Sequence, residues 1–404
     1  MLKTTISMKK FITLSLATLL VCSPLWAQKS IPHSVRTCNR ATALRTEIIL
    51  PKVKGFNCYK GDFHIHTSYS DGRITPAGRV VEAWLDGLDV IAITDHYEVR
   101  SGERRFFKVI APYSGDNEPM KYQSASEAGA VLADFNAIHE EAAAQLKKSG
   151  YEMLLVKGCE MARGAKTHGH FNALFLKDIN TVYDKDMDAA FRKVREQGGI
   201  VVHNHPAWSR DTSDKTEFHE LVYGEGLVDG VEVANGYTFY PHIVRRCIDE
   251  KLTMFGNSDE HDITSRRFTP MGVYRTMTLI FAKDLTEKAI KDAILARRTV
   301  AYSGGFLIGE ESWLVELLNA AVDCRLMRVD EKTNEHFYML TNTCSIPMHL
   351  RRGRTNYLLE PFKSVMIGFG KGKTEAKDAK PLFTINNMWV ADYQHPKVEL
   401  EIDK

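Results

Sequence analysis

Short apolar runs between residues 58 and 305 constrain this chain more than any other feature. They cover residues 89–94, 153–157, 171–176, 199–202, 230–233 and 252–255. Longer segments with the spacing of amphipathic helices separate them. Regular alternation of a short buried strand with a helix favours strands that lie parallel in one sheet. The pattern therefore predicts an α/β chain with a mostly parallel sheet or barrel.

The clearest of the helical segments runs from about residue 126 to residue 148. Ser124 and Glu127 have the spacing of a capping box, and Lys147 and Lys148 fall in the last turn. Gly150 follows, as expected after a helix end. These signals predict a helix that ends at about residue 149.

Composition places the chain among ordinary globular proteins. It has 404 residues, of which 44% are hydrophobic and 26% charged. This excludes a disordered chain, a collagen-like repeat and a coiled coil. The 53 Lys and Arg residues nearly balance the 51 Asp and Glu residues, so we expect no nucleic-acid partner. After about residue 305 the segments become short, aromatic or β-branched. We therefore expect a lead-in segment at 28–57, an α/β barrel at 58–305 and a small antiparallel β domain at 306–404.

The first 27 residues have the pattern of a secretory signal peptide. Lys9 and Lys10 precede an apolar run over residues 11–27, and Ala27 provides a small residue for cleavage. An uncleaved anchor helix is the alternative, and Pro24 argues against it. Processing as a lipoprotein at Cys22 is disfavoured by the preceding Val21. We expect an exported, periplasmic protein whose mature form does not insert into a membrane.

Six cysteines follow the predicted signal peptide. Pairing of Cys38 with Cys58, or of Cys324 with Cys344, would close short loops in an oxidising compartment. The alternative is that these thiols are buried and reduced, because a chain of this length needs no disulfide. Cys159 is expected to pack in the core, on the strand face opposite Glu160.

Histidine and carboxylate residues lie at the ends of several predicted strands. They form the segments HIHTSYSDG (64–72), TDH (94–96), GCE (158–160), HGH (168–170), HNHP (203–206) and SDEH (258–261). In a barrel of parallel strands these ends meet at one mouth. Burying so many imidazoles and carboxylates close together costs free energy unless cations bind between them. We therefore expect a cluster of two or three divalent ions. Ligands without thiolate favour Zn, Mn or Fe.

Together these motifs, in this order, resemble the PHP (polymerase and histidinol phosphatase) superfamily over about residues 58–305. The resemblance implies a distorted barrel of seven βα units with two or three metal ions, which hydrolyses phosphate esters. The longer run from residue 61 to residue 96 is also similar to exported bacterial phosphodiesterases that carry a C-terminal β domain.

Ligand roles follow from this resemblance by position. It implies that His64, His66 and Asp259 hold one metal and that Glu160 bridges to a second, completed by His170 and His205. Asp71, His96 and His261 would hold a third. Asp71 departs from relatives that have histidine there. His168 remains an alternative to His170, and His203 to His205.

The expected mechanism is attack on phosphorus by a metal-bridged hydroxide. Glu160 would bridge the metals. His203, on the face of His205, would contact substrate or transfer a proton, and the alternative for both His203 and His168 is a supporting hydrogen bond outside the metal ligands. Arg163, Lys166 and Arg210 follow ligand positions, so each is a candidate phosphate-binding group or a plain surface charge. A small-molecule phosphate ester, monoester or diester, is the expected substrate, and no organic cofactor is expected. The alternatives are a metal-dependent amidohydrolase and a non-enzymatic exported protein that binds metal or carbohydrate.

Overall fold

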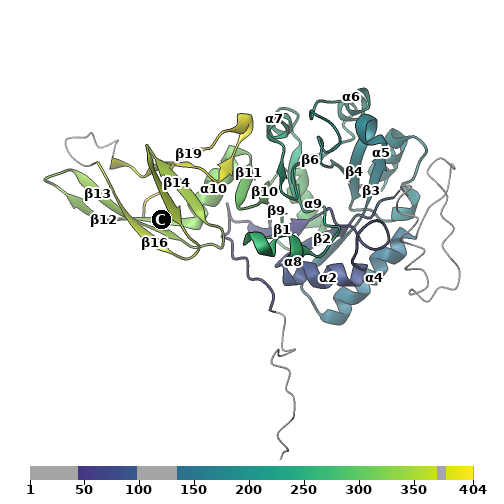
Figure 1. Cartoon of the computed structure of the whole chain (residues 1–404), viewed down its shortest axis with the longest axis horizontal. Coiled ribbons are helices and arrows are strands. Elements are labelled where there is room, and N and C mark those ends of the chain that lie inside the picture. The colour runs from purple at the N-terminus through teal and green to yellow at the C-terminus, as the bar shows by residue number, and fades with distance from the viewer. Residues whose placement is uncertain (1–43, 98–133, 371–378, 404) are drawn as a thin grey trace, which may run out of the picture. The chain divides into compact units, whose positions relative to one another are not determined.

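The computed structural model describes residues 44–97, 134–370 and 379–403 (Figure 1). Contacts between Cα atoms divide the chain after Leu44, and Arg45–Lys404 form one compact unit. The predicted signal peptide, with Cys22, lies outside the described residues, as does Cys38. None of the described helices combines the length and the apolar character that crossing a membrane requires.

A sheet of twelve strands forms the centre of the unit. Its order is β18-β11-β10-β9-β1-β2-β3-β4-β5-β6-β7, and β8 pairs with β6. The strands are β1 (Asn57–Asp62), β2 (Val90–Ile93), β3 (Leu154–Arg163), β4 (Gly169–Leu174), β5 (Ile200–His203), β6 (Gly230–Asn235), β7 (Thr238–Phe239), β8 (Thr253–Asn257), β9 (Met277–Ala282), β10 (Thr299–Ser303), β11 (Phe306–Gly309) and β18 (Met388–Trp389). All six predicted apolar runs lie in or overlap these strands. The α/β class is confirmed, whereas the count of seven βα units stays a prediction.

Strand directions differ in part from the mostly parallel sheet that we expected. β1, β2 and β3 run parallel, and so do β5, β6 and β8. β4 is antiparallel to both β3 and β5. Only the five-residue turn Gly164–His168 joins β3 to β4, and a parallel return needs a dozen residues or more. The short connection therefore reverses β4.

Threonine side chains close the gap between β8 and the β9–β10 pair. The Thr278 hydroxyl donates to the Gly256 carbonyl at 2.9 Å, and the Gly256 amide donates to the same hydroxyl at 3.1 Å. The Thr299 hydroxyl donates to the Met254 carbonyl at 2.8 Å. A Cβ on Gly256 would lie 2.9 Å from the Cβ of Ala301, so only glycine permits this approach.

Replacing Gly256 with alanine is expected to destabilise the protein by about 1–3 kcal/mol, because the added methyl group would be too close to Ala301 where β8 packs against β10. The measurement is the free energy of unfolding from a denaturant titration. Gly224→Ala is the matched control, since nothing lies within 4 Å of a Cβ built on Gly224. Equal stability of the two variants would contradict this close packing of Gly256 against Ala301.

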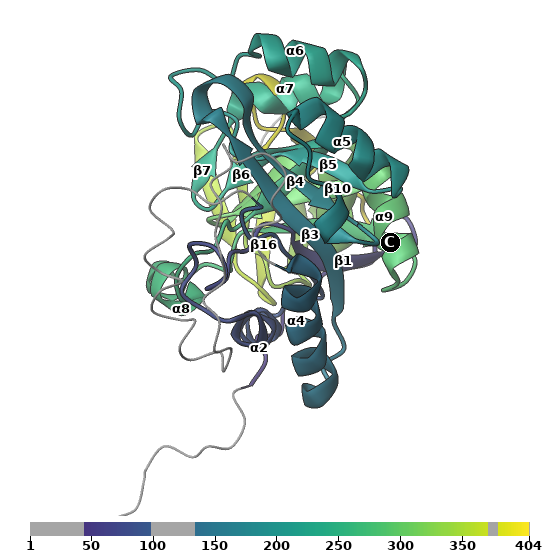
Figure 2. The same cartoon turned by 90° about the vertical axis from the view of Figure 1, so that its right-hand side faces the viewer.

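Eight described α-helices accompany the sheet (Figure 2). They are α2 (Pro76–Leu85), α4 (Phe135–Ser149), α5 (Met187–Glu196), α6 (Glu217–Gly224), α7 (Pro241–Asp249), α8 (Thr264–Arg267), α9 (Glu287–Leu295) and α10 (Glu311–Ala321). The predicted end of the 126–148 helix is confirmed, with Gly150 in the left-handed region at φ 65°. Its predicted start is wrong, because Asp134 has extended backbone angles and caps α4. Ser124 and Glu127 lie outside the described residues.

Residues after α10 form two small antiparallel sheets, drawn green to yellow in Figure 1. Their orders are β12-β13-β16 and β15-β14-β17-β19. The strands are β12 (Val322–Asp330), β13 (Glu335–Asn342), β14 (Met348–Arg352), β15 (Thr355–Leu359), β16 (Ser364–Phe369), β17 (Leu382–Ile385) and β19 (Lys397–Glu399). β11, which precedes α10, and β18, which follows it, both lie in the range 306–404 but belong to the large sheet. The domain boundary at residue 305 stays a prediction.

The cysteine alternatives are resolved in favour of reduced thiols. Cys58 and Cys344 are both free, so neither of the short loops considered is closed by a disulfide. The Cys344 thiol donates to the Ile346 carbonyl at 3.5 Å. Cys159 is fully buried in a hydrophobic cluster. Val156 lies four positions before Glu160 on the same strand and therefore on the same face, and it belongs to a different hydrophobic cluster from Cys159. Cys159 and Glu160 thus lie on opposite faces of the strand, as expected.

Candidate metal centre

Histidine and carboxylate residues gather at one edge of the large sheet. His64 and His66 follow β1, His96 follows β2, and Glu160 lies within β3. His205 follows β5, and Asp259 and His261 follow β8. His170 is near the beginning of β4 rather than beyond its end. Because β4 is antiparallel to its neighbours, its beginning lies where β3 and β5 end.

Glu160 is the centre of the cluster and is fully buried. Its carboxylate oxygens lie 3.3 Å from Nε2 of His64 and 2.7 Å from Nδ1 of His96. They also lie 3.3 Å from Nδ1 of His170 and 3.5 Å from Nε2 of His205. One carboxylate is thus shared by imidazoles from four separate segments of the chain.

Asp259 and Asp71 complete the cluster. Oδ1 of Asp259 is 3.2 Å from Nε2 of both His64 and His66. The Asp71 carboxylate is 3.4 Å from His66, 3.4 Å from His96 and 3.1 Å from His261. All nine side chains that the sequence suggested as ligands therefore meet in one place. The His261 side chain is 37% exposed and that of Asp71 is 29% exposed, so the cluster opens to solvent on their side.

Three groups of side chains within the cluster have the geometry to hold an ion, because their ligand atoms lie within 4.8 Å of one another. They are His64, His66 and Asp259; His64, Glu160 and His205; and His66, Asp71, His96 and His261. These groups overlap through His64 and His66. The overlap brings neighbouring ion positions close together.

Several buried ligand atoms have no hydrogen-bond partner among the described residues. They include Nε2 of His64 and of His66, Nδ1 of His170, Oε2 of Glu160 and Oδ1 of Asp259. A buried polar atom without a partner is costly, and such atoms are rare in folded proteins. Converging lone pairs of nitrogen and oxygen are the donor set of a divalent transition metal. The residues present therefore fit a divalent metal ion.

The groups around the two central carboxylates keep them ionised, which is the state that binds cations. Burial raises the pKa of Glu160, but the imidazoles of His96, His64 and His170 outweigh it and hold this pKa well below the usual range. The pKa of Asp259 is lowered in the same way by neighbouring imidazoles against the effect of burial. Burial lowers the pKa of His66 to about 3, with the nearby imidazoles of His261 and His96 acting in the same direction. Both carboxylates are therefore ionised and His66 is neutral at neutral pH, as metal ligands require.

Glu232 orients the cluster from the middle of β6, although no sequence motif pointed to it. It is fully buried, and its Oε1 lies 2.8 Å from Nδ1 of His64. The His205 amide donates to Oε2 at 2.8 Å, and the side-chain amides of Asn235 and Asn257 donate to the same carboxylate. The only sequence signal was an acidic residue inside the apolar run 230–233. A carboxylate behind a histidine fixes its tautomer and its direction.

The Glu232→Gln variant is expected to bind metal about 10–100-fold more weakly, because His64 loses its carboxylate partner. Competition with a chromogenic chelator measures this affinity. Excess metal should restore most of the bound ion. Glu331→Gln, at an exposed position between β12 and β13, provides the control. An unchanged affinity would exclude this role for Glu232.

Two further groups hold the loops that carry the ligands. Asp95 accepts hydrogen bonds from the Thr67 amide and from the hydroxyls of Thr67 and Ser70, at 2.5–2.6 Å. Arg79 of α2 is fully buried and donates to the backbone carbonyls of His66 and Glu260. One guanidinium thus joins the loop after β1 to the loop after β8.

His203 contacts different partners from His205, although both side chains line the same small pocket. β5 ends at His203, and the backbone then turns, with His205 at φ 25°. The His203 ring stacks on Phe171, and its Nδ1 lies 2.7 Å from the hydroxyl of Tyr223. Of the two open pairs, the structure brings His170 and His205 to Glu160. His168 instead lies beside Thr167, with its Nδ1 3.0 Å from the hydroxyl.

Arg163 does not point its guanidinium at the cluster as a phosphate-binding residue would. It donates to the carbonyls of Lys185 and Asp184 at 2.6 and 2.5 Å. Its guanidinium carbon also lies 5.2 Å from the centre of the Tyr183 ring. These contacts make Arg163 an anchor for the loop before α5.

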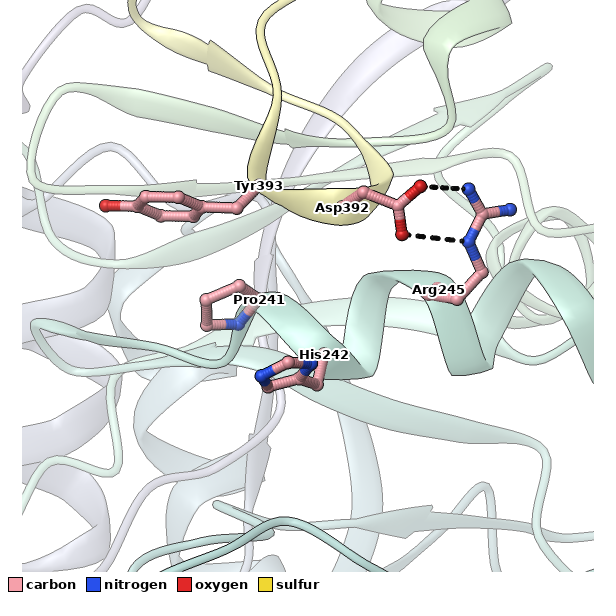
Figure 3. Close-up of a pocket in the computed structure, with 5 residues that line it drawn as sticks. All are labelled: Pro241, His242, Arg245, Asp392 and Tyr393. Carbon is pink, nitrogen blue, oxygen red and sulfur yellow. Dashed lines mark hydrogen bonds and ion pairs between the residues drawn. The ribbon is translucent and has the colours of Figure 1, made fainter.

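A surface pocket beside α7 contains none of the predicted ligands. Pro241, His242, Arg245, Asp392 and Tyr393 line it (Figure 3). Nε and Nη2 of Arg245 donate to the two Asp392 oxygens at 3.2 and 2.7 Å. This exposed ion pair joins α7 to the short 3-10 turn Ala391–Tyr393. The pocket is therefore a joint between two segments and is separate from the metal centre.

A curled α/β sheet with imidazoles and carboxylates clustered at one edge is the kind of site that metal-dependent hydrolases use. No family model matches the sequence, and no curated protein matches it. Among solved structures, this chain is similar to a two-domain protein from Bacteroides vulgatus that contains a predicted PHP-like metal-dependent phosphoesterase. The identity is 31% and the TM-score 0.76, over 88% of this chain and 98% of that chain. The chain belongs to this PHP-like family of metal-dependent phosphoesterases.

Two more distant solved structures resemble the chain too weakly to bear on its function. A metal-dependent phosphoesterase from Bifidobacterium adolescentis has 16% identity and a TM-score of 0.37, over 59% of this chain and 96% of that chain. A lesion-specific endonuclease from Pyrococcus furiosus has 13% identity and a TM-score of 0.38, over 63% of this chain and 59% of that chain.

Proposed function

We propose that the protein hydrolyses phosphate esters of small molecules with two or three divalent ions held in this cluster. The observation that carries the proposal is the buried Glu160 carboxylate, which faces Nε2 of His64 and Nδ1 of His170, two buried atoms that have no hydrogen-bond partner among the described residues. His64, His66 and Asp259 would hold one ion, and Glu160, His170 and His205 a second. Asp71, His96 and His261 would hold a third. Zn, Mn and Fe suit this set of donors.

Divalent ions held there would supply Lewis acidity, which activates water and neutralises phosphate charge. The protein's own part is to fix positions. Glu232 orients His64, and Asp95 holds the loop after β1. Trp208, whose ring centre lies 5.5 Å from that of His170 and 5.4 Å from that of His205, is 61% exposed at the rim. Its indole forms a wall against which the organic part of an ester can pack.

The test is an ester panel with purified protein loaded with Mn, Zn or Fe. Bis-nitrophenyl phosphate, nitrophenyl phosphate and an oligonucleotide separate diesterase, monoesterase and nuclease activities. An amide and lactone panel tests the amidohydrolase alternative. We expect phosphate ester turnover that a chelator abolishes. Retention of metal without turnover of any substrate would favour a binding protein and contradict the proposal.

Lys157 bears on the amidohydrolase alternative, because many enzymes of that class use a bridging lysine. Its Nζ donates to the Lys177 carbonyl at 3.1 Å, an exposed contact. This places the amine away from the carboxylate cluster. The position of Lys157 therefore does not favour an amidohydrolase.

Export to the periplasm remains part of the proposal and rests on residues 1–27 alone. Cell fractionation of the tagged full chain tests it. We expect the processed protein, shorter by these residues, in the periplasmic fraction. Unprocessed protein in the cytoplasm would refute it.

A further inference from the structure

A small hollow adjoins the metal centre on the side of His170 and His205. Those two residues line it together with Trp208, His203, Arg210 and His219. It is therefore continuous with the second of the proposed ion positions. A group that occupied the hollow would touch that position directly.

The hollow has the charge character of an anion site. No Asp or Glu residue is among the described side chains that line it. Nη1 of Arg210 is buried and has no hydrogen-bond partner among the described residues. A guanidinium nitrogen buried without an acceptor is costly, and a carboxylate or phosphate oxygen is its natural partner. The unused donor therefore points to an anionic ligand.

Hydrogen bonds hold the walls of the hollow in place. The Trp208 amide donates to the His205 carbonyl at 2.8 Å, and the Ser209 hydroxyl donates to the Ala165 carbonyl at 2.6 Å. The Thr216 amide donates to Nδ1 of His219, so Nε2 of His219 carries the proton and donates to the His168 carbonyl at 2.7 Å. Both ring nitrogens of His219 therefore have hydrogen-bond partners within the protein. Arg210 keeps a donor for a ligand.

We propose that the hollow receives a non-bridging oxygen of the substrate's phosphoryl group and that Arg210 donates a hydrogen bond to it. This inference rests on the proposed function and names the residue that recognises the phosphoryl group. Of the three cationic candidates in the sequence, Arg163 is held by backbone carbonyls and Lys166 is exposed on the turn between β3 and β4. Arg210 alone among these three has a buried nitrogen beside the ligands.

Calorimetric titration of the metal-loaded protein with inorganic phosphate tests this role. Arg210→Gln is expected to weaken phosphate binding by about tenfold or more, because a charge-assisted hydrogen bond is lost. Metal content should stay unchanged. Arg210→Lys should recover part of the affinity. Arg192→Gln removes an arginine charge at the surface of α5 and is the matched control.

Trp208 provides a second readout, since it lines the same hollow. Phosphate should change the tryptophan fluorescence of the parent protein, and this change should be absent in Trp208→Phe. Equal phosphate affinity of Arg210→Gln and the parent would overturn the inference. Binding of phosphate that depends on Arg210, without turnover of any ester, would uphold the subsite and contradict the proposed function instead.

Discussion

Replacing Glu160 with glutamine is expected to lower the rate of ester hydrolysis by about three orders of magnitude. Glutamine keeps the size of the side chain and can still accept the hydrogen bond from Asn204. It loses the negative charge that His64, His96, His170 and His205 share. Without that charge, two ion positions lose their common ligand. Metal analysis and kcat/KM on the best ester of the panel measure the effect.

Glu331→Gln serves as the control for Glu160→Gln, because it removes one exposed carboxylate far along the chain in the β12–β13 turn. We expect it to keep full activity and full metal content. Excess metal should fail to rescue Glu160→Gln, in contrast to Glu232→Gln. If Glu160→Gln kept both its metal and its turnover, the assignment of the centre would be wrong.

Much of the fold could be predicted from the sequence because its strands are short, apolar and regularly spaced. The end of α4 was also predictable from Gly150 and its preceding lysines. The direction of β4 was not, since it depends on the five-residue connection Gly164–His168 and not on the apolar run itself. The start of α4 at Asp134 was missed because the Ser124–Glu127 pair offered a stronger local signal.

Candidate ligands were easier to predict than the residues that position them. A histidine beside a strand end stands out in a sequence, and all nine suggested ligands lie in one cluster. Glu232 lies in mid-strand, and Arg79 reads as a surface residue of an amphipathic helix although it is fully buried. The partners that His203 and Arg163 contact could not be predicted either. Local sequence does not show how a backbone turns after a strand, as at His205, or which carbonyls a long side chain will reach.

The buried ion pair of Arg275 and Asp62 leads to the prediction with the largest expected effect on stability. Arg275 is 2% exposed, and its Nε donates to Oδ2 of Asp62 at 2.7 Å. Asp62 also accepts from the Ser258 hydroxyl and from the amides of Ser258 and His64. The pair thus joins the end of β1 to the segment that carries Asp259.

Arg275→Met is expected to lower the free energy of unfolding by about 3–5 kcal/mol, because it leaves the Asp62 carboxylate buried without a countercharge. Chemical denaturation of the metal-free protein measures this, so that loss of metal does not contribute. The double variant Asp62→Asn with Arg275→Met removes both charges and should be more stable than Arg275→Met alone. A loss below about 1 kcal/mol in Arg275→Met would show that water reaches Asp62 and screens it. The expected order of stability, with the double variant between the parent and the single variant, follows only if the buried charge itself is the cost.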